Sequence, residues 1–117
     1  LKGVISPTSV GIAAGARAVT DANAMDKIVI TGLGIPSQLK TYVHNGACPK
    51  FALWNPVDLG YLTTYVTHRL IAGEIKGEPG ETFEAGRLGE YTIAEDGSVL
   101  LGPPFVFDKD NVDNFDF

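Results

Sequence analysis

The order of hydrophobic and polar positions in the first half of the chain predicts alternating strands and helices. Short runs that read as strands occupy Lys2–Ser6, Lys27–Thr31 and Lys50–Trp54, and the first two are rich in β-branched residues. The stretches between these runs carry apolar residues at helical spacing. Strands separated by helices of about 10 to 15 residues favour a parallel sheet with helices on its faces. The expected fold class is therefore α/β.

The two intervening helices have recognisable starts and stops. Thr8 or Ser9 can cap the first helix. Its expected packing face is made of small apolar residues, Val10, Ala13, Ala14 and Val19. Pro36 suits the first position of the second helix, and Asn45-Gly46 is a typical helix stop. The apolar face expected on that second helix consists of Leu39, Tyr42 and Val43.

The pattern changes after residue 54. Asn55 is a strong helix cap, Pro56 suits the first helical position, and Gly73 marks the end of this third helix. Beyond it turn residues dominate.

The remaining apolar runs are short. We expect Glu90–Ile93 and Ser98–Leu101 to form a hairpin around the turn Glu95-Asp96-Gly97, with a last strand at Phe105–Phe107.

Composition narrows the class of protein. The chain has 117 residues, 44% hydrophobic and 20% charged, as in an ordinary globular domain. Its net charge of -5 and scattered basic residues argue against nucleic acid as a partner. Cys48 is the only cysteine, so no disulfide can form within the chain.

In open α/β sheets, ligands bind beyond the carboxyl ends of the strands. That rule selects three loops: Pro7-Thr8-Ser9, Leu33-Gly34-Ile35 and Trp54-Asn55-Pro56. Their hydroxyl and amide groups, with a flat indole face, suit a neutral polyhydroxylated ligand. A plainer interpretation stays open at this point, in which Thr8 and Asn55 only cap helices and Trp54 packs in the core.

Signals of catalysis, metal binding or cofactor binding are weak. No sequence signature of a cysteine nucleophile surrounds Cys48 and His44. With one cysteine and two histidines, the chain has too few of these residues for a zinc site built from them. Gly32-Leu33-Gly34 lacks the third glycine of a dinucleotide loop. The tail 108–113 lacks the glycine and glutamate of a calcium loop. We expect no catalytic residues, no metal and no cofactor.

Four stretches resemble the C-terminal part of type I periplasmic sugar-binding proteins: G-V-I-S-P-T, T-G-L-G-I-P-S-Q, F-A-L-W-N-P-V-D-L-G-Y and L-L-G-P-P-F-V-F-D-K-D-N-V-D-N-F-D-F. The likeness is greatest to rhamnose-binding receptors of bacterial ABC importers, and autoinducer-2 receptors come second. The resemblance implies a Rossmann-like parallel sheet flanked by helices, in a two-lobed protein that closes over a monosaccharide. It also implies a membrane permease as partner and a periplasmic or other extracytoplasmic location, with a signal peptide.

The same resemblance predicts how the chain divides. Residues 1–54 look like the later half of the C-terminal lobe, 55–104 like a segment of the other lobe, and 105–117 like a tail returning to the first. Leu1 is not an initiator Met, and the strand pattern begins at once. We therefore expect a fragment, which can self-associate where lobe surfaces are left uncovered.

By similarity, Pro7, Thr8 and Ser9 match a ligand-contacting loop, and Trp54 and Asn55 match a hinge-adjacent binding position. Where many relatives carry an aspartate, this sequence has Leu33 or Gly34. Fewer acceptors and more apolar surface favour a deoxy sugar. Rhamnose is the expected ligand.

Two other classes remain open. One is the effector-binding domain of a sugar-responsive transcriptional repressor, which shares this fold. The other is a small flavodoxin-like enzyme or binding module, against which the lack of a paired acid and base counts.

Overall fold

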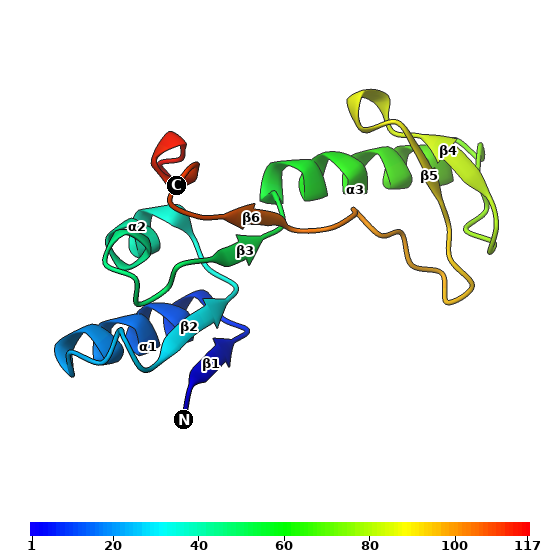
Figure 1. Ribbon diagram of the computed structural model, residues 1–117. Helices are drawn as coiled ribbons and strands as arrows, with labels where there is room; N and C mark the ends of the chain where they lie inside the picture. The colour runs from blue at the N-terminus through cyan, green and yellow to red at the C-terminus, as the bar shows by residue number, and fades with distance from the viewer. The chain divides into compact units, whose positions relative to one another are not determined.

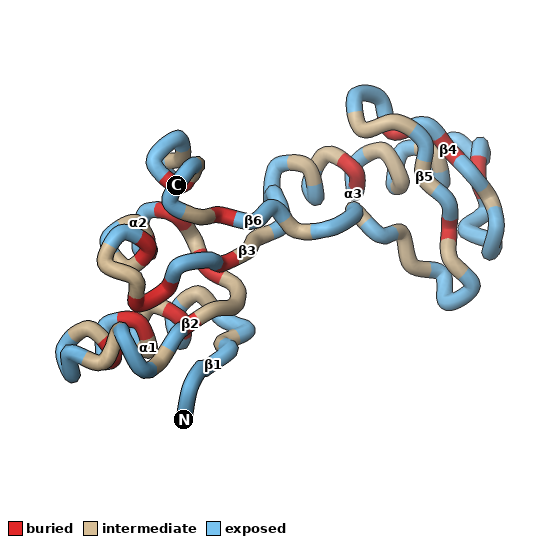
Figure 2. The backbone as a smooth tube through the Cα atoms, viewed as in Figure 1, coloured by how far each residue is buried: buried red, intermediate tan, exposed pale blue.

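The computed structural model describes all 117 residues, and they divide into two compact units (Figure 1). The first unit consists of Leu1–Leu53 and Pro104–Phe117, and the second of Trp54–Pro103. Each unit has its own cluster of buried residues, drawn red in Figure 2. Neither unit contains a helix with the length and apolar character needed to span a membrane.

The sheet of the first unit begins with two parallel strands. Strand β1 (Gly3–Ser6) pairs in parallel with β2 (Val29–Gly32), from Gly3 opposite Val29 to Ser6 opposite Gly32. A single parallel bridge between Leu33 and Ala52 connects the end of β2 to the next strand. These pairings confirm the predicted parallel arrangement.

The remaining strands of this unit pair antiparallel. Strand β3 (Phe51–Leu53) lies beside β6 (Phe105–Phe107), with Leu53 opposite Phe105. The last strand was thus correctly placed in the sequence, and its direction is that of an antiparallel edge strand, as mixed sheets often have.

Two helices cover the sheet of the first unit. Helix α1 (Ser9–Asp21) packs against β1, β2 and α2 (Pro36–His44). The expected face of α1 was half right: Val19 is buried and Ala13 packs against the core, but Val10 is 76% exposed and Ala14 is also exposed. The buried positions are Ile12, Ala16 and Val19. Their spacing of four and three residues sets one stripe toward the sheet, and Val10 lies off that stripe.

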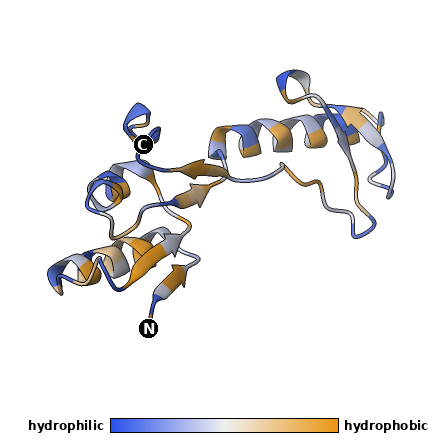
Figure 3. Ribbon diagram, in the orientation of Figure 1, coloured by the Kyte–Doolittle hydropathy of each residue, from blue (hydrophilic) through white to orange (hydrophobic).

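The C-terminal tail is an integral part of the first unit. The tail packs against helix α2. The Ser37 N–H donates to the Phe117 carbonyl oxygen at 3.0 Å, and His44 Nε2 lies 3.1 Å from Asp113 Oδ1. The Phe51 and Phe107 rings stack beneath, with centroids 4.9 Å apart. The tail therefore covers the core although Figure 3 shows it as mostly hydrophilic.

The second unit is built on helix α3 (Pro56–Ile71), which begins as predicted with Asn55 as its cap. Leu62 is its one buried residue. The small core around Leu62 has five buried members, Leu62, Ile75, Phe83, Ala85 and Ile93.

The hairpin of the second unit differs from the prediction. Strand β4 (Thr82–Glu84) pairs antiparallel with β5 (Glu90–Thr92) around the short 3-10 helix η1 (Gly86–Leu88). Residues 98–101 form no strand. The Phe83 and Tyr91 rings, 6.2 Å apart, stack across the β4–β5 pair. This cross-strand aromatic pair favours the pairing of β5 with β4, which precedes it in the chain, over the predicted pairing with residues 98–101. The predicted turn at 95–97 does form, but no strand follows it.

Candidate functional site

Two of the three predicted loops meet at the carboxyl ends of the parallel strands. The Leu33 N–H donates to the Ser6 carbonyl oxygen at 2.9 Å, so the loop after β2 lies against the end of β1. The Gly34 N–H donates to the Ala52 carbonyl oxygen at 3.1 Å. These bonds hold both loops at the edge of the sheet where ligands bind in α/β proteins.

The loop after β1 carries exposed hydroxyl groups on a fixed backbone. Pro7 and Thr8 are exposed, and Ser9 is half-buried. Thr8 Oγ1 accepts a hydrogen bond from the Gly11 N–H at 3.1 Å and so caps α1. Because capping uses only an acceptor site of the oxygen, the Thr8 hydroxyl proton stays available to a ligand acceptor. Capping and binding are compatible at this residue.

The loop after β2 offers an apolar surface instead of a charged one. Leu33 is half-buried and Gly34 is buried. Both backbone N–H groups are bonded within the sheet, and a side chain at Gly34 would overlap that of Leu39. Gly34 therefore sets the close packing of the loop, and the Leu33 side chain is the group that this loop can present.

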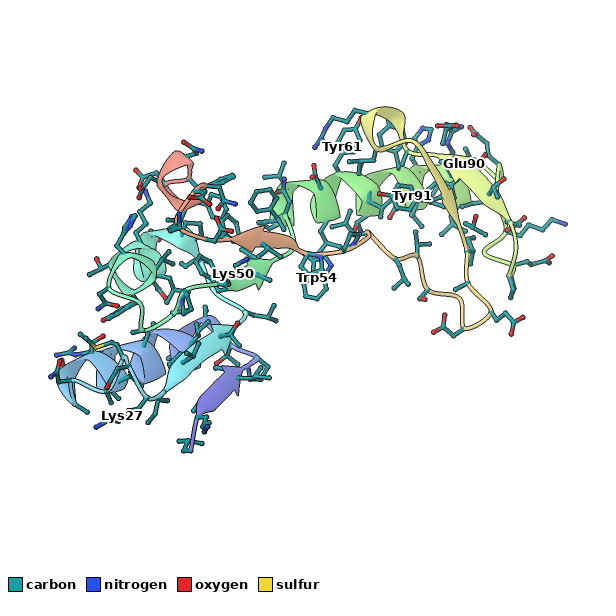
Figure 4. All side chains as sticks on the ribbon, viewed as in Figure 1. Lys27, Lys50, Trp54, Tyr61, Glu90 and Tyr91 are labelled. Atoms are coloured by element: carbon teal, nitrogen blue, oxygen red, sulfur yellow. The ribbon has the colours of Figure 1, made fainter.

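Trp54 and Asn55 directly follow β3 in the chain and belong to the second unit. Trp54 is 41% exposed, so it is not a core residue. Its Nε1–H donates to the Gly102 carbonyl oxygen at 2.7 Å, so the indole donor is paired while part of the side chain stays exposed (Figure 4).

The two polar atoms of the Asn55 side chain are used differently. Its Oδ1 accepts from the Val57 N–H at 2.9 Å and from the Asp58 N–H at 3.4 Å, which caps α3. Its amide nitrogen makes no hydrogen bond within the chain. The side chain can cap the helix and still donate to a ligand oxygen.

Sequence reasoning missed two residues that shape these loops. Ser6 donates from Oγ to the Thr8 carbonyl oxygen at 3.2 Å and fixes the turn around Pro7. Gly102 supplies the acceptor for Trp54. The signal for Ser6 was its hydroxyl at the end of a strand, next to Pro7. Nothing in the sequence near Gly102 points to a partner 48 residues away.

The residues weighed for catalysis have structural roles. Cys48 has no exposed surface, and burial raises the pKa of its thiol to about 11. The Cys48 Sγ faces the Lys50 carbonyl oxygen at 3.7 Å, while His44 contacts Asp113. A neutral, buried thiol is a poor nucleophile. No cluster of three His, Cys, Asp or Glu side chains is placed to hold a metal ion.

The first unit is an α/β arrangement, with parallel strands β1 and β2, two packed helices, and loops without charged side chains at the carboxyl ends of those strands. In open α/β sheets this edge is where ligands bind. The sequence profile of the periplasmic binding protein domain matches residues 1–75, more than half of the chain. The chain belongs to the periplasmic binding protein family.

Three solved structures resemble it. A sugar ABC transporter protein from Actinomyces odontolyticus is 46% identical over the whole chain, with a TM-score of 0.87. An ABC transporter solute-binding protein from Clostridium phytofermentas with bound L-rhamnose is 36% identical over 97% of the chain, with a TM-score of 0.83. LsrB from Clostridium saccharobutylicum in complex with AI-2 is 25% identical over the whole chain, with a TM-score of 0.80.

The chain spans 38%, 39% and 40% of the lengths of these three structures. The family and the fold class predicted from sequence are thereby confirmed, and the relatives are binding proteins, not enzymes.

Proposed function

We propose that this chain is part of the substrate-binding component of a sugar ABC importer, which binds a monosaccharide outside the cytoplasm and delivers it to a membrane permease. The observation that carries the proposal is the set of uncharged groups at Thr8, Leu33, Trp54 and Asn55, in a family whose relatives include a sugar ABC transporter protein. Hydroxyl, amide and indole groups without charge suit a neutral sugar. Binding changes the balance between open and closed lobes, and the permease recognises the closed form.

We propose that residues 1–54 and 105–117 belong to one lobe and 55–104 to the other. The outer face of α3 supports this division. Thr63, Thr64 and Thr67 are exposed, yet their hydroxyls donate back to carbonyl oxygens within the helix at 2.8 to 2.9 Å. The hydroxyl protons of this face are thus used within the helix, and Ile71, one turn beyond Thr67, is 83% exposed.

A helix face that meets water normally carries charge. We therefore expect this face of α3 to be covered by the remainder of its own lobe, since the matching structures are longer than this chain. In the isolated chain, the uncovered face is the site at which self-association is expected.

The sugar we propose is rhamnose. Leu33 presents an aliphatic side chain where a carboxylate would pair with sugar hydroxyls, and a 6-deoxy sugar has a methyl group in place of one hydroxyl. The solute-binding protein from Clostridium phytofermentas, which holds L-rhamnose, is 36% identical to this chain. A Leu33→Asp variant should weaken rhamnose binding about tenfold, because a carboxylate would be buried without a partner. Unchanged affinity would contradict the role of Leu33.

Uptake of autoinducer-2 is the second candidate function. LsrB from Clostridium saccharobutylicum, in complex with AI-2, shares the fold at a TM-score of 0.80. Autoinducer-2 therefore belongs in the ligand panel beside the sugars.

A thermal-shift screen of the intact protein tests the proposal. The panel contains L-rhamnose, other 6-deoxy and ordinary hexoses, pentoses and autoinducer-2. A ligand that binds only the folded state raises the melting temperature with its concentration. A shift with L-rhamnose supports the proposal, a shift with autoinducer-2 alone selects the second candidate, and no shift with any of them contradicts both.

A further inference from the structure

Two chain segments connect the first unit to the second. One leaves the first unit after Leu53, and the other returns to it at Pro104. On the first-unit side, the segments are joined by backbone pairing of Leu53 with Phe105 at the end of the β3–β6 ladder.

Backbone pairing cannot continue past that point. If the ladder kept its register, Trp54 would lie opposite Pro104 and Asn55 opposite Pro103. Proline has no N–H to donate, so these positions cannot extend the ladder. The Trp54 indole supplies a donor instead, and its Nε1–H bonds to the Gly102 carbonyl oxygen at 2.7 Å. A side-chain bond thus replaces the next backbone bond within the second unit, where the two strands of chain would otherwise separate.

We infer that Trp54 is a positioning residue for lobe closure, because its indole N–H bond to Gly102 holds the outgoing and returning connections together within the second unit. We call this hydrogen bond the clasp. This inference rests on the proposed function. With the clasp intact, the two connections change conformation together when the lobes move. Without it, the returning segment 102–104 is free to move independently, and closing the lobes must order it at an entropic cost.

The clasp also separates two roles of one side chain. The indole N–H is committed to Gly102, so it is not a donor for ligand. The half-exposed ring face remains for the apolar side of a sugar. A substitution that removes the N–H but keeps the ring therefore tests positioning without removing the surface on which the sugar lies.

The matched probes are tryptophan analogues at position 54 of the intact protein. 3-Benzothienylalanine keeps the size of the ring and replaces the N–H by sulfur, whereas 5-fluorotryptophan keeps the N–H. Circular dichroism establishes that each variant is folded before comparison.

The readouts are backbone amide exchange in residues 98–105 without sugar, and the Kd for L-rhamnose. With benzothienylalanine, exchange at Phe105, the end of the β3–β6 ladder nearest to this bond, should accelerate severalfold. The Kd should rise about fivefold, the equivalent of one ordinary hydrogen bond. The fluorinated analogue should behave as the natural protein does. A residue that only stacks on sugar would leave the exchange unchanged.

The outcomes test the role of the Trp54–Gly102 bond separately from the proposed sugar-binding function. Sugar binding by the natural protein, with unaltered exchange and Kd in the variant that lacks the N–H, overturns the clasp and leaves the proposed function standing. Failure of the natural protein to bind any sugar overturns the proposed function, while the exchange measurement still decides whether the clasp orders the returning segment.

Discussion

The backbone N–H of Leu33 donates a hydrogen bond to the carbonyl oxygen of Ser6 at 2.9 Å, and this bond brings the loops after β1 and β2 together. The close approach depends on the residue before Leu33. Gly32 has a φ of +138°, and a Cβ there would overlap the Ser6 carbonyl oxygen. The geometry of the candidate site therefore requires glycine, which has no side chain, at position 32.

Gly32→Ala should lower the free energy of unfolding by about 3 kcal/mol, from backbone strain together with the overlap. Urea denaturation followed by circular dichroism measures the change. Gly46→Ala is the matched control, since Gly46 also has a positive φ, of +85°, but no atom within 4 Å of the added Cβ. It should cost about 1 kcal/mol. Equal losses in the two variants would show that the contact with Ser6 does not matter.

Asn55 allows helix capping and ligand binding to be separated. Asn55→Ala removes the acceptor for the Val57 and Asp58 N–H groups and should destabilise the second unit by about 1 kcal/mol. Asn55→Asp keeps a capping oxygen but has no amide donor. We expect the Asp variant to melt like the natural protein and to bind sugar more weakly. Full sugar affinity in the Asp variant would mean that Asn55 only caps the helix.

Cys48 predicts a specific loss of stability at alkaline pH. Burial raises the pKa of its thiol from 9.0 to about 11. Below pH 9 the thiol is neutral in both states. Between pH 9 and about 11 it ionises only when the protein unfolds, so the free energy of unfolding falls over that interval by on the order of 2 kcal/mol.

Denaturation curves at a series of pH values measure this fall, and Cys48→Ala should reduce its slope. Iodoacetamide at pH 8 should also leave the folded protein unmodified and label it in denaturant. Rapid labelling of the folded protein would contradict the burial.

Glu81 holds a loop of the second unit. Its Oε2 accepts hydrogen bonds from the backbone N–H groups of Lys76, Gly77 and Glu78, at 2.9, 2.8 and 2.9 Å. These bonds, that of Glu78 first, lower the pKa of the Glu81 carboxyl below its ordinary value of 4.5. The stabilisation is therefore present above pH 4.5 and is lost as the pH falls through the lowered pKa.

Glu81→Gln should speed amide exchange at residues 76–78 at pH 7, because a neutral oxygen is a weaker acceptor than a carboxylate. Glu78→Gln is the control, since the Glu78 carboxylate does not make these bonds. If exchange changed equally in both variants, the cause would be the lost negative charge and not the bonds to Glu81.

Local signals in the sequence were enough for most of the first unit and for the start of α3 in the second. The caps Thr8 and Asn55, the prolines that open α2 and α3, and the strand runs could all be located because each depends on neighbours a few residues away. Fold class followed from their alternation.

Interactions over long sequence separations could not be predicted in the same way. The bond from Trp54 to Gly102 spans 48 residues, and the parallel bridge between Leu33 and Ala52 spans 19. Val10 and Ala14 of α1 were also wrongly placed on the packing face, because a run of small residues such as Ala13, Ala14 and Ala16 shows little contrast between its faces. At the candidate site, residue types could be predicted, but not that the N–H groups of Leu33 and Gly34 are bonded within the sheet.

Calorimetric titration of the intact protein with L-rhamnose tests the central claim most directly. The account predicts saturable binding of one sugar per protein with a sub-millimolar Kd, weakened by Leu33→Asp and by Asn55→Asp. Absence of heat at millimolar L-rhamnose, from protein shown to be folded, would contradict the claim that these uncharged loops form a rhamnose site.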